Sequence, residues 1–106
     1  MADANPNFAI RQFTTANGVA IPGQGGLWIP IVAPITCGQI VLQNMDQTNN
    51  CNVRSDPADP TTQKVLNAGL ELTLRASQGA AWGPGMLVCY VQPVAGQGPI
   101  VGTFLR

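Results

Sequence analysis

Glycine and proline interrupt this chain so often that long helices are unfavourable. The 106 residues include twelve glycines and nine prolines, and most of the segments between them have eight residues or fewer. In a helix interior a glycine costs about 1 kcal/mol and a proline about 3 kcal/mol relative to alanine. The segments between the breaks are rich in Val, Ile, Leu and Thr, which is typical of strands. The sequence therefore predicts an all-β protein.

The segments with strand character follow one another at short, turn-separated intervals. Residues 70–75 show the cleanest alternation, with leucine at every second position. Pro30 indicates an edge position or a bulge in the first segment, because proline cannot donate to a sheet ladder. We expect an antiparallel β-sandwich, jelly-roll-like, or a small barrel of about seven strands. The expected strands are residues 27–32, 39–44, 51–55, 64–66 (a short strand or a turn), 70–75, 86–91 and 100–105.

Residues 1–26 have a different character from the remainder. Phe8, Ile10 and Phe13 are apolar residues in an otherwise polar stretch, and turn residues follow at 17–18 and 22–26. The pattern predicts an extended N-terminal arm that packs on another surface; the alternative is a disordered terminus. Residues 27–106 are then a single β-sandwich domain.

Charged residues are unusually scarce. Five Lys/Arg, five Asp/Glu and no His give a formal net charge of zero, and 45% of the residues are hydrophobic. Soluble domains are typically about one quarter charged. We therefore expect much of the surface to be covered by copies of the chain or by other proteins. The scattered positive charges form no basic patch, and Pro or Gly breaks every apolar run, so neither nucleic acid nor a membrane is an expected partner.

The cysteines and the N-terminus indicate synthesis in a reducing cytosol. Cys37, Cys51 and Cys89 are odd in number and form no C-x-x-C pair, so we expect buried, reduced thiols rather than zinc ligands or disulfides. Residues 1–7 lack the basic and apolar regions of a secretory signal.

Few residues offer catalytic or ligand-binding chemistry. Without histidine, Ser-His-Asp and Cys-His catalysis are excluded. Glu71 is interpreted as a solvated strand residue. Asp56 and Asp59 have the oxygen ligands that calcium prefers, but Asp-Pro is more typical of turns. Residues 23–26 lack the strand–turn–helix context of a phosphate loop. We expect no enzyme activity, metal or cofactor.

The sequence is compatible with three roles for each of the two tryptophans. Trp28 at a strand start and Trp82 in a Gly/Pro-rich loop are each compatible with an interface, a sugar-stacking platform or the core. A carbohydrate-binding module requires Trp28, Trp82 and Tyr90 to line one exposed face.

The order of segments from Ile40 to Arg106 resembles small β-sandwich virion proteins of tailed bacteriophages. The similarity is carried by I-V-L-Q-N at 40–44, N-C-N-V-R-S-D-P at 50–57, N-A-G-L-E-L-T-L at 67–74 and V-C-Y-V-Q-P-V-A-G-Q-G-P at 88–99. The chain departs from that pattern in two turns, where N-A-G-L-E replaces a P-G-E turn and A-G-Q-G replaces A-S-G-T-G.

This resemblance implies a non-enzymatic virion component, made in the bacterial cytoplasm, that works by binding. The expected role is a capsid decoration or cement protein that binds the major capsid protein or other virion proteins and copies of itself. A tail or baseplate component is an alternative, as is the carbohydrate-binding module. The oligomer suited to capsid three-fold positions is a trimer, with the N-terminal arm clamping adjacent subunits. The expected interface residues are Phe8, Ile10, Phe13, Trp28 and Trp82.

Overall fold

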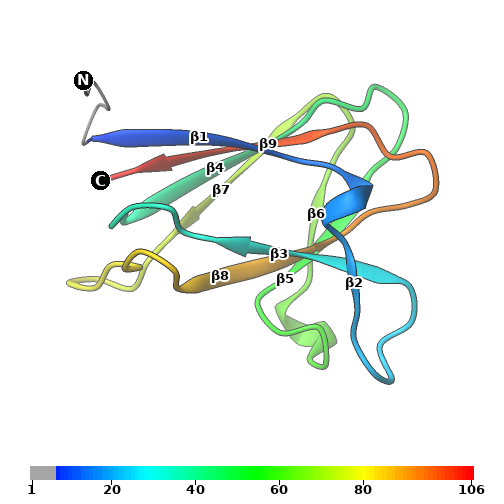
Figure 1. Ribbon diagram of the computed structural model, residues 1–106, viewed down its shortest axis with the longest axis horizontal. Helices are drawn as coiled ribbons and strands as arrows, with labels where there is room; N and C mark the ends of the chain where they lie inside the picture. Colours follow the sequence, from blue (N-terminus) through cyan, green and yellow to red (C-terminus); the bar gives the residue numbers. More distant parts are fainter. Residues whose placement is uncertain (1–6) are drawn as a thin grey trace.

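Two antiparallel β-sheets pack face to face in the computed structural model, which describes residues 7–106 (Figure 1). The four-stranded sheet has the order β1-β9-β4-β7 and the five-stranded sheet the order β2-β3-β8-β5-β6. The described strands are β1 (Phe8–Phe13), β2 (Val19–Ala20), β3 (Leu27–Val32), β4 (Gln39–Asn44), β5 (Cys51–Arg54), β6 (Lys64–Leu66), β7 (Glu71–Arg75), β8 (Leu87–Gln92) and β9 (Ile100–Leu105), with short 3-10 helices η1 (Thr15–Asn17) and η2 (Pro60–Thr62).

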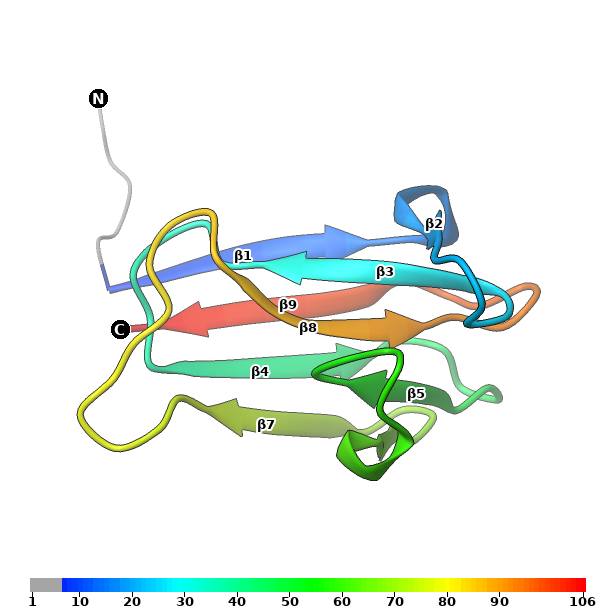
Figure 2. The ribbon, with the colours of Figure 1, turned by 90° about the horizontal axis from the view of Figure 1, so that it is seen from below.

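The all-β sandwich prediction is confirmed, and each of the seven expected strands is present. Figure 2 shows the strands of the two sheets running in similar directions, in two layers that do not close into a barrel. The interpretation of Pro30 also agrees with the structure. β2 pairs only with Leu27 and Trp28, so Pro30 lies where β3 is the sheet edge, and a register shift follows at Ile31. Among the described residues no helix is long and apolar enough to cross a membrane.

The core lies between the sheets because the inward residues of each strand are apolar. Residues along β4 and β9 alternate between buried and half-buried side chains, as a period of two requires. Phe104 is the largest fully buried side chain of the four-stranded sheet, and Gly102 leaves room for its ring because a Cβ there would approach the ring to 3.3 Å. The buried apolar cluster comprises Ile29, Ile31, Ala33, Cys37, Ile40, Leu42, Cys51, Val53, Leu66, Cys89, Val91, Ile100 and Phe104.

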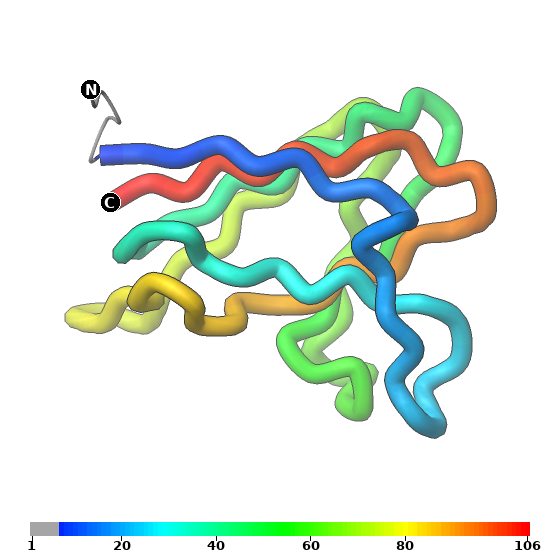
Figure 3. The backbone as a smooth tube through the Cα atoms, viewed as in Figure 1, coloured from blue at the N-terminus to red at the C-terminus, as the bar shows by residue number. Residues whose placement is uncertain are grey.

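The segment expected to be an N-terminal arm folds onto the sandwich over its described part. β1 pairs antiparallel with β9 along all six of its residues, and β2 pairs with β3. Figure 3 traces β1 beside the C-terminal strand. The physical reason is that β9 would otherwise expose a row of unpaired backbone groups, and that Phe13 packs against the core. The sandwich therefore includes residues 7–26, and the part of the expected arm at 1–6 lies outside the described residues.

A buried polar cluster connects the loops at one end of the sandwich. Asp46, which is 9% exposed, accepts hydrogen bonds from the backbone N–H groups of Thr48 (2.8 Å), Asn49 (2.9 Å) and Gly98 (2.8 Å). The Thr48 hydroxyl and the Asn49 amide also donate to this carboxylate. The donors, with that of Gly98 foremost, hold the pKa of Asp46 well below its usual value.

Asn44 at the end of β4 extends this cluster. Its Nδ2 donates to the carbonyls of Asn49 (2.7 Å) and Leu66 (3.2 Å). Its Oδ1 accepts from the Asp46 N–H and from Gln97 Nε2, each at 3.0 Å. Three segments distant in sequence, 44–49, Leu66 and 97–98, therefore meet at two side chains.

Truncation of Phe104 is expected to destabilise the sandwich. Phe104→Ala removes a fully buried ring and leaves a cavity, so the free energy of unfolding should fall by about 3–5 kcal/mol. Urea unfolding followed by tryptophan fluorescence measures the change. Leu105→Ala, at a half-buried outward position next to it, is the control and should cost clearly less; equal losses would contradict the assigned register.

The cluster around Asp46 predicts acid sensitivity. Because its folded-state pKa is lowered, Asp46 contributes stability that is present above its unfolded pKa of about 3.9 and is lost as the pH falls through the folded pKa. Asp46→Asn replaces an acceptor by a donor facing Gly98, so it should lower stability at pH 7 and flatten the loss below about pH 4.

Urea midpoints at neutral and acid pH test this expectation, with Asp56→Asn as the matched control. Asp56 is exposed and accepts one N–H, from Ala58. The pKa of Asp59 is also lowered, chiefly by the Thr61 hydroxyl, so some acid sensitivity should remain in Asp46→Asn. Unchanged acid sensitivity in Asp46→Asn would contradict the assignment.

Candidate functional site

The structure separates the five residues that the sequence predicts for an interface. Phe8 is 39% exposed and Ile10 54% exposed, and both lie on the outer side of β1. Phe13 and Trp82 are half-buried and pack against the core. Trp28 is 1% exposed. Phe8 and Ile10 are therefore the two classed as exposed and available to a partner, and Trp28 is corrected to a buried residue of the chain itself.

Trp28 is buried although it points away from the core. It lies on the outer side of the five-stranded sheet, opposite to its buried neighbour Ile29. The Arg54 guanidinium stacks over the Trp28 ring at 5.4 Å, and the indole N–H donates to the Gln24 carbonyl (3.2 Å). Arg54 is itself held by Gln63 and by the Pro57 carbonyl. Arg54 of β5, held in place by the loop that follows it, thus covers Trp28.

The outward side of the four-stranded sheet is open and nearly free of charge. We call the outward-facing side chains of β1, β9 and β4 the outer face. Ile10, Thr103 and Val41 are neighbours across these three strands, and no charged residue occurs among the set. The outer face comprises Phe8, Ile10, Gln12, Val101, Thr103, Leu105, Gln39, Val41 and Gln43.

Three apolar members of the outer face were missed by sequence reasoning. Val41, Val101 and Leu105 are half-buried and alternate with buried residues along β4 and β9. The available signal was that residues 40–42 and 100–101 are apolar at consecutive positions, which places apolar side chains on both sides of a strand.

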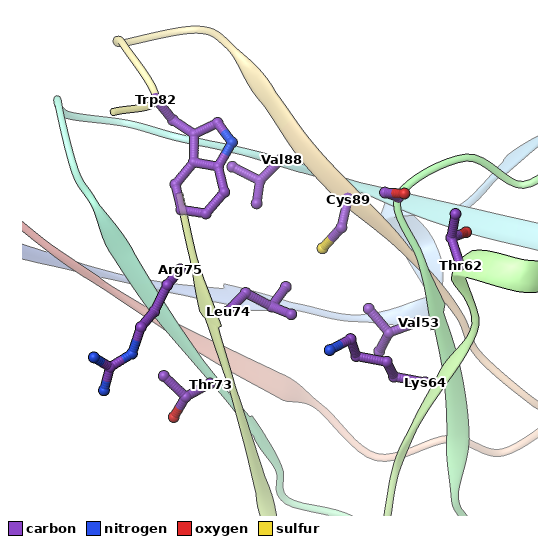
Figure 4. Close-up of a pocket in the computed structure, with 10 residues that line it drawn as sticks. Val53, Thr62, Lys64, Thr73, Leu74, Arg75, Trp82, Val88 and Cys89 are labelled. Carbon is purple, nitrogen blue, oxygen red and sulfur yellow. The ribbon is translucent and has the colours of Figure 1, made fainter. Parts of the chain in front are cut away.

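A cavity of about 560 Å³ opens between the sheets on the side of β7 (Figure 4). Leu74, Trp82 and Val88 supply apolar walls, and Figure 4 shows Lys64 with its ammonium directed toward the β7 side. Arg75 also lines the cavity, although Figure 4 shows its guanidinium directed to the other side of β7 from Lys64, and the lining includes no acidic residue. The complete lining is Val53, Ser55, Thr62, Lys64, Thr73, Leu74, Arg75, Trp82, Val88 and Cys89.

The cysteines are buried and free, as the sequence predicts. Burial raises the pKa of Cys89, at the cavity, to about 12 and that of Cys51 to about 11, and raises the pKa of Cys37. A thiol with such a pKa is protonated at neutral pH and is a weak nucleophile. The cavity thus offers apolar contact, hydroxyl groups and positive charge.

In the loop considered for calcium binding, the carboxylates of Asp56 and Asp59 accept hydrogen bonds from residues of the same loop. Asp56 Oδ1 accepts the Ala58 N–H at 2.9 Å, which forms an Asx-turn. Asp59 accepts the N–H and hydroxyl of Thr61 and caps η2. Within residues 7–106 no group of three or more His, Cys, Asp or Glu side chains is placed to hold a metal ion.

The three aromatic residues of the carbohydrate alternative do not share one exposed face. Trp82 lines the cavity between the sheets, whereas Tyr90 is half-buried on the outward side of β8. Trp28 lies beneath Arg54. A sugar could therefore not stack on the three rings together.

Iodide is expected to quench the fluorescence of Trp82 more strongly than caesium in dilute solution. Lys64 and Arg75 concentrate anions at this cavity, while Trp28 is inaccessible. Trp82→Phe should remove most of the quenchable emission, and Lys64→Gln/Arg75→Gln should remove the preference for iodide. Trp28→Phe is the matched control and should retain both. Equal quenching by the two ions would contradict a cationic cavity.

Comparisons of the chain with protein-family models, with curated proteins and with solved structures find no match.

Proposed function

We propose that this protein is a non-enzymatic structural component of a tailed-bacteriophage virion, a decoration or cement protein that binds capsid subunits and copies of itself. The observation that carries the proposal is the outer face. A free-standing small domain normally covers its surface with interspersed charges, whereas the outer face has none and is apolar at Phe8, Ile10, Val41, Val101 and Leu105. The segment order that resembles phage virion proteins supports the same role.

The outer face suits a contact that is repeated many times. The three strands of the outer face, about 4.8 Å apart and six residues long at about 3.3 Å per residue, present on the order of 300 Å². A stable interface buries about 800 Å² on each partner. One outer face is thus a modest contact, and a lattice compensates by presenting many copies together. The same surface would serve a tail or baseplate component, and the location is decided by which particle binds.

A charge placed on the outer face is expected to abolish particle binding. Ile10→Glu puts a carboxylate at the most exposed apolar position of the outer face, so the affinity for the heads of the phage that encodes the chain should fall at least about tenfold. Co-sedimentation of purified protein with empty heads, and separately with tails, measures the binding.

Val65→Glu is the matched control. Val65 is 45% exposed on β6 of the other sheet, so this substitution adds the same charge away from the outer face and should leave binding unchanged. Absence of binding by the unmodified protein to heads and tails, or equal losses in the two variants, would overturn the proposed function.

A further inference from the structure

β7 presents an unprotected sheet edge. At the two ends of the strand, the Leu70 carbonyl accepts from the Asn44 N–H and the Ala76 N–H donates to the Gly38 carbonyl, each at 2.9 Å. Because such pairs alternate along an antiparallel ladder, Leu72 and Leu74 also bond to β4. The N–H and C=O groups of the residues between them, 71, 73 and 75, therefore point away from the sheet.

The other described edges are blocked or short. On β1, Arg11 points inward opposite Gly102 and donates from Nη1 to the Ile10 carbonyl (2.9 Å) at the free edge. An inward charge at an edge is a known protection against strand addition. β2 has two residues, and β6 has three, the first of which is a lysine. β7, with neither proline nor an inward charge, is the edge suited to strand pairing.

The sequence of β7 is complementary to itself. Glu71-Leu72-Thr73-Leu74-Arg75 reads as acid, leucine, threonine, leucine, base. In an antiparallel pair of two copies centred on Thr73, Glu71 of each copy lies opposite Arg75 of the other. The free backbone groups at 71, 73 and 75 face each other in the bonding positions, so about six backbone hydrogen bonds can form. The two side chains have opposite charge, and among residues 7–106 neither has an ion pair in the single chain.

We propose that two copies of this chain pair through β7 to form a symmetric dimer with one continuous sheet across the two subunits. The interface is isologous, as most dimer interfaces are. Cross-strand pairs of opposite charge and of leucines each add to the stability of such a ladder. The proposal rests on the proposed function in one respect, since it specifies how the copies of an assembly protein associate.

The cavity gives a second, independent reason for this pairing. Thr73, Leu74 and Arg75 of β7 line its mouth, and Leu72 and Leu74 are only half-buried. In the dimer Leu72 of each copy lies opposite Leu74 of the other, on the core side of the sheet. The partner strand therefore adds apolar side chains beside the open side of the sandwich. An edge that needed no partner would be expected to carry polar inward residues here.

The symmetry also places the two outer faces on the same side of the dimer, one on each side of the charged β7 pair. The two-fold axis of an antiparallel strand pair is perpendicular to the sheet, so both outer faces point the same way. The uncharged area presented to a particle doubles to on the order of 600 Å², closer to the roughly 800 Å² that each partner buries in a standard interface.

Sedimentation equilibrium across a concentration series tests the dimer with three sets of variants. Thr73→Pro removes an N–H that is not used within the chain, so folding should be retained while dimerisation weakens at least about tenfold. Gln12→Pro is the matched control, because the alternation on β1 leaves the Gln12 N–H unused at the opposite edge of the same sheet; its dimer should persist.

Charge reversal provides the specific signature. Glu71→Arg alone and Arg75→Glu alone place like charges opposite each other and should weaken the dimer. An equimolar mixture of the two variants should form a heterodimer, and the double variant Glu71→Arg/Arg75→Glu should dimerise like the original chain. Circular dichroism of each variant confirms the fold.

Several outcomes would overturn the pairing: a monomer at about 1 mM chain, a trimer, or a dimer unaffected by Thr73→Pro and by charge reversal. Two of these readouts separate this inference from the proposed function. A chain that binds heads but remains monomeric overturns the dimer alone, whereas a β7-paired dimer that binds neither heads nor tails overturns the function alone.

Discussion

The buried carboxylate of Asp46 is the interaction on which the arrangement of strands depends. It accepts hydrogen bonds from its own loop and from the Gly98 N–H. Asn44, at the end of β4, donates to the Leu66 carbonyl at the end of β6. Gly98 approaches so closely that a Cβ there would lie 3.2 Å from Asp46. Because a one-residue slip would turn every side chain of a strand to the other side, fixing the ends of β4 and β9 fixes which residues form the outer face.

Several of the few charged side chains have structural roles, and their positions leave part of the surface without charge. Asp46 is used inside the protein, Arg54 covers Trp28, and Arg11 caps the edge of β1. Glu71 and Arg75 remain on β7, at the margin of the four-stranded sheet. The neighbouring strands are left without charge on their outward sides, so an uncharged face and a charged edge lie next to each other.

Local pattern was sufficient for the strands of residues 27–106, because alternation and turn residues are short-range signals. It failed for residues 8–13, where the strand is created by pairing with β9 at the far end of the chain, a contact that no local pattern encodes. It also misassigned Trp28, whose burial depends on Arg54 of β5 and on Gln24 in the loop between β2 and β3. The cavity could not be predicted either, since it arises where four strands and two loops leave space.

A sandwich with one open edge and one uncharged face has two distinct ways to associate, and their geometry makes them cooperative. Pairing through β7 uses directional backbone hydrogen bonds and opposite charges, so it selects one partner strand and one register. Contact through the outer face uses apolar area, which is less specific but additive over neighbouring copies. A partner strand approaches the β7 edge within the plane of the sheet, whereas a particle approaches the outer face perpendicular to that plane. Neither contact therefore obstructs the other. A dimer formed first would bring two faces to a particle at once, and the second face would bind at a high effective concentration.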